Sequence, residues 1–181
     1  MADSNITKKA LSNALRQLME EMPFKKISVA DICEKCDLHR KSFYYHFRDK
    51  YDLVNWIFDT EFIALARNRT SDDRWEFIEM MCGYFYDNRS FYSKVLQIKG
   101  QNSFSEHFRE FMHPLLRNRI TEIVGKKDIP DLCVDFFADG IFCSMERWLL
   151  DKHCMPPSQF VSIIKQLVEL TAAAIQQDMT Q

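Results

Sequence analysis

The chain has 181 residues, which suits one domain or a small module joined to a larger one. Hydrophobic residues make up 46% and charged residues 28%, and this composition excludes a disordered chain and a collagen-like repeat. Only four Gly and five Pro are present. This scarcity predicts an all-α fold, because sandwiches, barrels and phosphate-binding α/β folds use both residues in turns and loops. The formal net charge is −2, so a nucleic-acid-binding surface would have to be a local patch.

The sequence shows no sign of export or of a membrane segment. Residues 1–22 lack the unbroken apolar region of a signal peptide, and no run of about 18 apolar residues occurs. The six cysteines are scattered, mostly among apolar neighbours, which favours reduced thiols over a disulfide framework. Cys33 and Cys36 have CxxC spacing, and a metal or redox role is the alternative to helix packing, but no second CxxC or HxxxH completes a zinc site. We therefore expect a cytoplasmic protein without metal, cofactor or membrane contact.

Apolar residues recur at helical spacing along the chain, and about nine helices are predicted. Ser28, with Asp31 three positions later, predicts a capping box at the start of the second helix. Pro114 predicts a kink or a break in the seventh. The predicted helices cover residues 6–22, 29–35, 39–46, 49–67, 72–88, 90–98, 103–124, 131–153 and 158–177.

Charge is distributed unevenly along the chain. Residues 1–50 contain ten Lys/Arg and seven Asp/Glu, a balance of +3, whereas the remainder has a balance of −5. This asymmetry predicts a basic N-terminal module, residues 1–50, on an acidic helical body, residues 51–181, with the fourth helix, 49–67, as the link.

Two short helices joined by a tight turn, over residues 29–46, fit the plan of a helix-turn-helix DNA-binding domain. The second helix of such a pair enters the major groove, so its inner face must be apolar and its outer face polar and basic. The inner face is predicted to consist of Val29, Ile32, Cys33, Leu38 and Phe43. The outer face is predicted to consist of His39, Arg40, Lys41, Ser42 and Tyr45. Tyr44 and His46 are predicted to supply further hydrogen-bond donors to phosphate, and a partly buried position in the core is the alternative for Tyr44. For any one of these residues, a solvated surface position without DNA contact is the alternative.

One run in this region is distinctive. It reads Phe43-Tyr44-Tyr45-His46-Phe47 and is followed by Asp49-Lys50 and Asp52-Leu53. The segment from Ile27 to Val54 closely resembles the DNA-binding domain of TetR-family transcriptional regulators, and the resemblance covers about residues 6–66. The segments 54–58 and 148–150 are similar to the branch that contains regulators of dihydroxyacetone kinase operons. Lys41 departs from the pattern, because the family often has Gly or another small residue there.

The resemblance implies a homodimer on a near-palindromic operator, with a helical body for dimerisation and effector binding. By matching position it implies that Ser42 touches base edges or phosphate, and that Tyr44, Tyr45 and His46 hold the DNA backbone. It also implies that Ser28 belongs to this surface and that Lys50 joins the N-terminal amides of the fourth helix at a phosphate. Arg40 or Lys41 would reach a guanine edge, and the sequence leaves open which one.

Two apolar stripes near the C-terminus predict the dimer interface, because adjacent helices with broad apolar faces can pair with their symmetry mates as a four-helix bundle. The stripes consist of Phe137, Ile141, Met145 and Trp148 with Leu149 on the penultimate helix and of Phe160, Ile163, Ile164, Leu167, Val168 and Ile175 on the last. The alternative is that both stripes face the core of the same chain.

Residues 75–111 are rich in aromatic side chains, a composition found in apolar ligand pockets and in ordinary cores. The candidate effector-pocket residues are Trp75, Tyr84, Tyr92, Phe104, His107, Phe108 and Phe111. A partner protein in place of a small-molecule effector is the alternative.

Taken together, these features predict a homodimeric repressor that an effector relieves. The alternative is a helical interaction adaptor or co-regulator, such as an activator working with a partner protein, that retains a helix-turn-helix domain. We expect no enzyme, since the sequence contains no Gly-rich phosphate loop, nucleophile elbow or HExxH motif.

Overall fold

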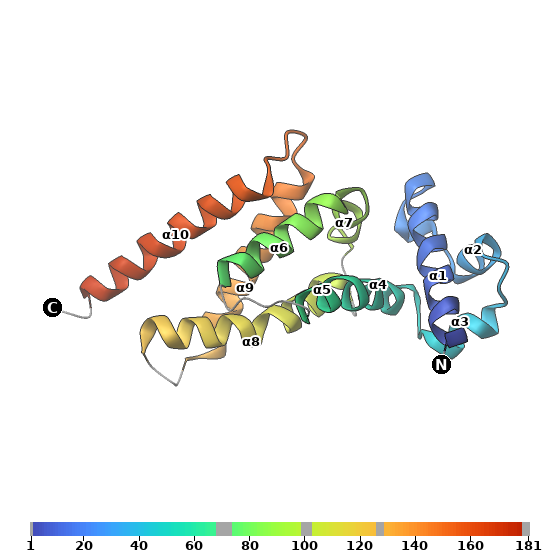
Figure 1. Cartoon of the computed structure of the whole chain (residues 1–181), viewed down its shortest axis with the longest axis horizontal. Helices are drawn as coiled ribbons and strands as arrows, with labels where there is room; N and C mark the ends of the chain where they lie inside the picture. Colours follow the sequence, from blue (N-terminus) through green and yellow to red (C-terminus); the bar gives the residue numbers. More distant parts are fainter. Residues whose placement is uncertain (1, 68–73, 99–102, 126–128, 179–181) are drawn as a thin grey trace. The chain divides into compact units, whose positions relative to one another are not determined.

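The computed structural model describes residues 2–67, 74–98, 103–125 and 129–178, and the helices and turns of these ranges confirm the predicted all-α class (Figure 1). If α4, the π-helical segment η2 and α5 are taken as one continuous helix, the described ranges contain the nine helices expected. The elements are α1 (Ala2–Glu21), the 3-10 turn η1 (Phe24–Lys26), α2 (Val29–Lys35), α3 (Arg40–His46), α4 (Lys50–Phe58), η2 (Asp59–Ile63), α5 (Ala64–Arg67), α6 (Arg74–Asp87), α7 (Arg89–Val95), α8 (Phe104–Val124), α9 (Asp131–Leu150) and α10 (Pro157–Asp178).

The end of one later helix differs from expectation, and of the kink or break expected at Pro114 the break is absent. α9 ends at Leu150 rather than near residue 153, because Asp151 adopts an extended conformation with φ −64° and ψ 131°. α8 runs through Pro114 without being split. Pro114 lies on the exposed side of α8, so water can satisfy the backbone carbonyl that loses its amide partner there.

The start of α2 follows from its first residues. The Ser28 hydroxyl accepts from the Asp31 amide at 3.2 Å, and the Asp31 carboxylate accepts from the Ser28 amide at 2.7 Å, so the predicted capping box is present. The amide and hydroxyl of Ser28 both donate to this carboxylate, and these hydrogen bonds lower the pKa of Asp31.

The turn after α2 is a Schellman motif. The Leu38 amide donates to the Cys33 carbonyl at 2.9 Å, and the Asp37 amide donates to the Glu34 carbonyl at 3.2 Å. Asp37 has a φ of +52°, in the left-handed region that reverses the chain direction at a helix end. The turn delivers the chain to His39, the N-cap of α3.

The chain divides into two compact units. The first unit contains residues 1–68 and 88–108, and therefore holds α1 to α5, α7 and the first turn of α8. The second unit contains residues 69–87 and 109–181, and therefore holds α6, most of α8, α9 and α10.

Each unit has its own buried residues. In the first unit, Leu11, Leu15 and Ile32 have no exposed side-chain surface, and the fully buried rings of Phe58 and Phe62 stack with centroids 5.2 Å apart. In the second unit, α10 packs on α6. Each of the two units therefore has side chains packed in its interior.

Candidate nucleic-acid interface

The outer face of α3 carries the exposed polar residues that the sequence predicted. Phe43 is fully buried beneath α3, whereas Tyr44 is 50% and Tyr45 82% exposed. Arg40 and Lys41 are exposed as well, and Lys41 has neither an ion pair nor a hydrogen bond with any residue that the structure describes. The remaining predicted residues of this face are exposed His39 and half-buried Ser42 and His46. α3 therefore presents two cations and two phenols on a single surface.

A rigid apolar support holds this face. Phe43 packs against Phe47 at a centroid distance of 5.7 Å, and Phe47 contacts Trp56 of α4 at the same distance, edge to face. Ile32 and Cys33 of α2 are buried behind α3. Because buried aromatic and aliphatic side chains allow little rearrangement, α3 is fixed on α2 and α4.

Arg40 is ordered by its own helix. One of its guanidinium nitrogens donates to the Tyr44 hydroxyl at 3.4 Å, and the guanidinium carbon lies 5.9 Å from the Tyr44 ring centroid. The hydrogen bond to Tyr44 raises the pKa of Arg40 above its usual value. The side chain is thus oriented along the exposed face of α3 before any ligand binds.

Lys50 has contacts other than those that the resemblance implied. Its ammonium donates to the carbonyls of Phe24 at 2.7 Å and Ile27 at 2.6 Å, and it lies 4.4 Å from the Phe24 ring centroid. The amides of Tyr51 and Asp52 donate to the Asp49 carboxylate. Both groups already have partners within the protein, so a phosphate would have to displace them, and the joint phosphate site stays a prediction. In this structure Lys50 braces the connector between α1 and α2.

Ser28 also has internal partners. Its amide and hydroxyl are used in the capping box of α2, although the residue itself is exposed. Ser28 therefore positions α2, and any DNA contact by its hydroxyl would have to replace the bond to Asp31.

Lys8 of α1 is a neighbour of this surface that sequence reasoning missed. Its ammonium lies 5.8 Å from the Phe47 ring centroid and 5.7 Å from that of Trp56, next to the C-terminal end of α3. Burial, followed by the charge of Lys8, lowers the pKa of His46. Lys8 is far from α3 in sequence, so no local pattern could have indicated this proximity.

The CxxC pair lies in the last turn of α2 rather than at an open site. Both thiols are free, Cys33 is buried, and the Cys36 thiol donates to the Ile32 carbonyl at 3.2 Å. Burial raises the pKa of both thiols, which disfavours the thiolate that metal binding or redox chemistry requires. The described residues contain no group of three or more His, Cys, Asp or Glu side chains arranged for a metal ion.

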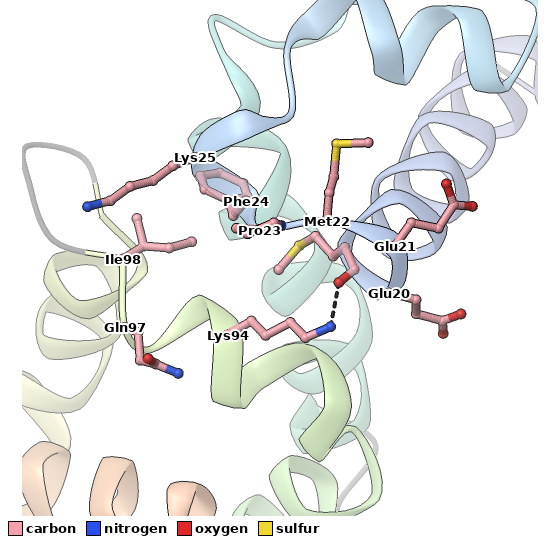
Figure 2. A pocket seen from close by; sticks show the side chains of 10 residues that line it. Glu20, Glu21, Met22, Pro23, Phe24, Lys25, Lys94, Gln97 and Ile98 are labelled. Carbon is pink, nitrogen blue, oxygen red and sulfur yellow. Dashed lines mark hydrogen bonds between the residues drawn. The ribbon is translucent and has the colours of Figure 1, made fainter.

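A groove of about 500 Å³ lies in the first unit at the end of α1 (Figure 2). Its apolar floor includes Met19, Phe24 and Ile98, and its charged lining residues are two glutamates and two lysines. The charges balance, so the groove has no excess of positive charge for phosphate and does not extend the basic face of α3.

The candidate effector residues fall into both units. In the first unit, Tyr92, Phe104 and Phe108 are fully buried and pack on one another, with 5.4 Å between Tyr92 and Phe104 and 6.0 Å between Phe104 and Phe108. His107 lies 2.7 Å from the Asp59 carboxylate. These four side chains form tight aromatic packing in this structure.

The other three candidate effector residues belong to the second unit. Tyr84 is buried, whereas Trp75 and Phe111 are half-buried. Trp75 has the Lys165 ammonium 5.6 Å from its ring centroid. An effector site that uses these residues stays a prediction.

The predicted dimer residues also divide into two groups. Met145, Trp148 and Phe160 are buried in the core of the second unit, where Trp148 stacks on Phe160 at 4.4 Å and donates to the Met155 carbonyl at 2.8 Å. Their assignment to an intermolecular surface is therefore corrected, because they are covered by their own chain. Exposed Phe137 and Leu167 and half-buried Ile141, Ile164 and Val168 keep accessible surface.

Four apolar side chains are more exposed than most of the described stripe residues, and all of them except Ile163 lie outside the predicted stripes. They are Leu132 at 78% and Phe136 at 73% on α9, and Leu170 at 69% and Ile163 at 42% on α10. Together with Phe137 and Leu167 they define what we call the α9/α10 apolar face.

The helix-turn-helix with a basic outer face, followed by a body that is helical in the ranges described, defines a class of DNA-binding transcriptional regulators. A family model described as bacterial regulatory proteins, tetR family, matches residues 11–57. A second model, described as transcriptional regulator C-terminal region, matches residues 73–170, more than half of the chain. The chain belongs to the TetR family of transcriptional regulators, and is thus a DNA-binding regulator and not an enzyme.

Two relatives share a name. The chain is 31% identical over 99 residues to the HTH-type dhaKLM operon transcriptional activator DhaS of Lactococcus lactis subsp. lactis (strain IL1403). That match covers 54% of this chain and 53% of the relative, so it spans about half the length of the curated protein. A solved structure named dihydroxyacetone kinase operon activator DhaS is 26% identical with a TM-score of 0.61, and the match covers 94% of this chain and 97% of that one.

A further solved structure supports the fold. A TetR transcriptional regulator from Streptococcus agalactiae 2603V has a TM-score of 0.73 at 22% identity, over 92% of this chain and 96% of that one. Among the helices that the structure describes, none is both long and apolar enough to cross a membrane.

Proposed function

We propose that the chain acts as a homodimer that binds a near-palindromic operator, with α3 of each protomer in the major groove. The observation that carries the proposal is the outer face of α3, where Arg40 and Lys41 stand exposed on a buried apolar support. Arg40 and Lys41 contact base edges, because their long donors can reach the acceptors of guanine. Tyr44, Tyr45 and His46 contact the DNA backbone as hydrogen-bond donors.

The α9/α10 apolar face is the proposed dimer contact. Leu132 and Phe136 are mostly exposed on the single chain, and groups of large exposed apolar side chains on a soluble protein mark interaction surfaces. A two-fold pairing of α9 and α10 with the same helices of a second copy buries these side chains as a four-helix bundle.

The sign of regulation that we propose is activation. Two relatives, at 31% and 26% identity, carry the word activator in their names, whereas the sequence alone led to the expectation of a repressor. The promoter of a dihydroxyacetone kinase operon is therefore the first target to test, with transcription from a reporter as the measurement. A rise in transcription when the protein is supplied supports activation, and a fall supports repression.

Selection from genomic DNA tests DNA recognition directly. The protein is mixed with sheared genomic DNA at low and at moderate salt, and the retained fragments are sequenced. We expect enrichment of one near-palindromic sequence, with binding that weakens steeply as salt rises, because two basic faces displace counterions from several phosphates. Uniform weak binding to all fragments would instead support an interaction adaptor.

A matched pair of variants tests whether the outer face of α3 is the DNA-binding surface. Lys41→Ala should lower affinity for the enriched duplex by about tenfold and reduce its salt dependence. Lys152→Ala removes an exposed cation of the second unit, in the turn after α9, and should leave binding unchanged. Equal effects of both substitutions would show that α3 is not the DNA-binding face.

A further inference from the structure

Helix α1 is tied at its C-terminal half to segments that follow α4 in sequence. The Arg16 guanidinium donates to the Glu61 carboxylate at 2.6 Å, and its carbon lies 4.3 Å from the Phe91 ring centroid. The Lys94 ammonium donates to the Met19 carbonyl, as the dashed line in Figure 2 shows. Three contacts, one from η2 and two from α7, therefore hold a short stretch of α1.

The residues that contact α1 lie on η2 and α7. Glu61 belongs to η2, a π-helical insertion in the long fourth helix, and such insertions occur frequently at functional sites. Phe91 and Lys94 belong to α7, which is joined to α6 of the second unit by the single residue Asn88. Phe91 and Lys94 therefore tie α1 to the helix that directly follows the second unit's α6 in sequence.

These contacts are more protected than an ordinary surface ion pair. The side chains of Arg16 and Glu61 are 22% and 39% exposed, and the ring partner Phe91 is 4% exposed. By comparison, the Lys35–Glu21 pair, which joins α2 to α1 within the helix-turn-helix domain, has side chains that are 34% and 54% exposed. Partial burial reduces solvent screening, so the Arg16 contacts hold α1 more firmly than the Lys35 pair does.

We propose that Arg16 and Lys94 form a clamp that holds α1 on α7 and η2, and that this clamp sets the half-site spacing that the dimer recognises. The proposal rests on the dimeric DNA binding proposed above. Arg16 and Lys94 are positioning residues in this scheme, because they contact neither base nor phosphate. They fix the orientation of helices α1 to α3 relative to α7 and η2.

The clamp affects DNA binding because a dimer that binds two half-sites at once needs a fixed separation between its α3 helices, whereas binding to one half-site does not. A dimer gains from its second half-site only if both α3 helices are held at the separation of the two major-groove segments. When the clamp is released, each α3 stays folded on its own apolar support and still binds one half-site. The advantage of simultaneous binding then falls, and the preference for a single spacing becomes weaker.

The test uses Arg16→Met and Glu61→Gln, with Lys35→Met as the matched control that breaks an ion pair inside the helix-turn-helix domain. The probes are the duplex enriched from genomic DNA, a duplex with one half-site, and full duplexes lengthened between the half-sites by one or two base pairs. Arg16→Met should bind the single half-site as the unsubstituted protein does and lose about tenfold on the full duplex. Its penalty on the lengthened duplexes should shrink, and Lys35→Met should change neither property.

Hydrogen exchange of the free protein tests the clamp without DNA. Arg16→Met and Glu61→Gln should speed exchange in residues 91–95 of α7 and in the last turn of α1, whereas Lys35→Met should not alter residues 91–95. Unchanged exchange in both variants, or an unchanged spacing preference, overturns the clamp. Faster exchange without any enriched DNA sequence shows instead that the clamp exists and that the proposed DNA function fails.

Discussion

Replacing Lys50 by Met removes the ammonium group but keeps a long apolar stem, so it isolates the contribution of the charge. In the structure this ammonium donates to the Phe24 and Ile27 carbonyls at 2.7 and 2.6 Å and faces the Phe24 ring at 4.4 Å. A third carbonyl, that of Lys25, lies at 3.5 Å. The substitution therefore leaves the connector between α1 and α2 without its brace.

The expected loss follows from these contacts. Hydrogen bonds to a charged group contribute about 1.5–3 kcal/mol each, and a cation over an aromatic ring adds about 1 kcal/mol. Lys50 is half-buried, and water can reach the freed carbonyls because Lys25 and Lys26 beside them are exposed, so the sum is reduced. We expect the free energy of unfolding to fall by about 2–3 kcal/mol, which corresponds to a fall in Tm of about 5–10 °C for a chain of this length.

Urea unfolding, followed by far-ultraviolet ellipticity, measures this change. Lys41→Met is the matched control, because Lys41 is an exposed cation of α3 without an ion pair or hydrogen bond to the described residues. The control should stay within about 0.5 kcal/mol of the unsubstituted protein and lose DNA affinity instead. An unchanged urea midpoint for Lys50→Met, with an unchanged slope, would refute the role of Lys50 as a brace.

Four further predictions concern single residues. Tyr45→Phe should leave stability unchanged, because the ring is 82% exposed, and should weaken binding to all DNA sequences by about threefold in a gel-shift titration. Phe136→Glu should raise the dimer dissociation constant by at least about thirtyfold in sedimentation equilibrium, since it places a charge in the α9/α10 apolar face, and an intact dimer would exclude this face. The pKa of Asp31 is lowered in the folded protein, so its contribution to stability is complete above the unfolded pKa of 3.8 and is lost as the pH falls through the lower folded pKa. The difference in unfolding free energy between the unsubstituted protein and Asp31→Asn should therefore disappear in acid. Urea unfolding at several pH values measures this difference. Asp37→Gly relieves a φ of +52° and should raise stability by up to about 1 kcal/mol, and a lower Tm would show that the Asp37 side chain stabilises the turn.

Local signals in the sequence were sufficient for the fold and for the outer face of α3. The capping box at Ser28, the turn before His39 and the burial of Phe43 each depend on residues within a few positions of one another. Hydrogen-bonding side chains at helix ends and apolar residues at helical spacing act over such short distances, so a single sequence is enough to reveal them.

The direction in which α9 faces could not be predicted, because both of its sides are apolar. Met145 and Trp148 lie on the buried side, and Leu132 and Phe136 lie on the exposed side. The apolar residues on both sides of α9 recur with the same helical period, so the sequence does not tell them apart. Only the packing of α9 within the second unit determines which side is buried.

Long-range contacts of charged groups were equally hidden. Lys50 meets carbonyls more than twenty positions away, and Lys8 of α1 lies beside the rings of Phe47 and Trp56, which are far from it in sequence. A cation at the start of a helix has several possible partners, and the choice between phosphate and a neighbouring carbonyl depends on the tertiary structure.

The contact between Arg40 and Tyr44 bears on how quickly the regulator can search a chromosome. An arginine that leaves a phenol to reach a base exchanges one partner for another, so on an incorrect base pair it gains little and the complex dissociates soon. With the base contact proposed for Arg40, only a guanine, which has two acceptors side by side, outweighs the lost phenol, so we expect a longer residence time at the target than on other sequences.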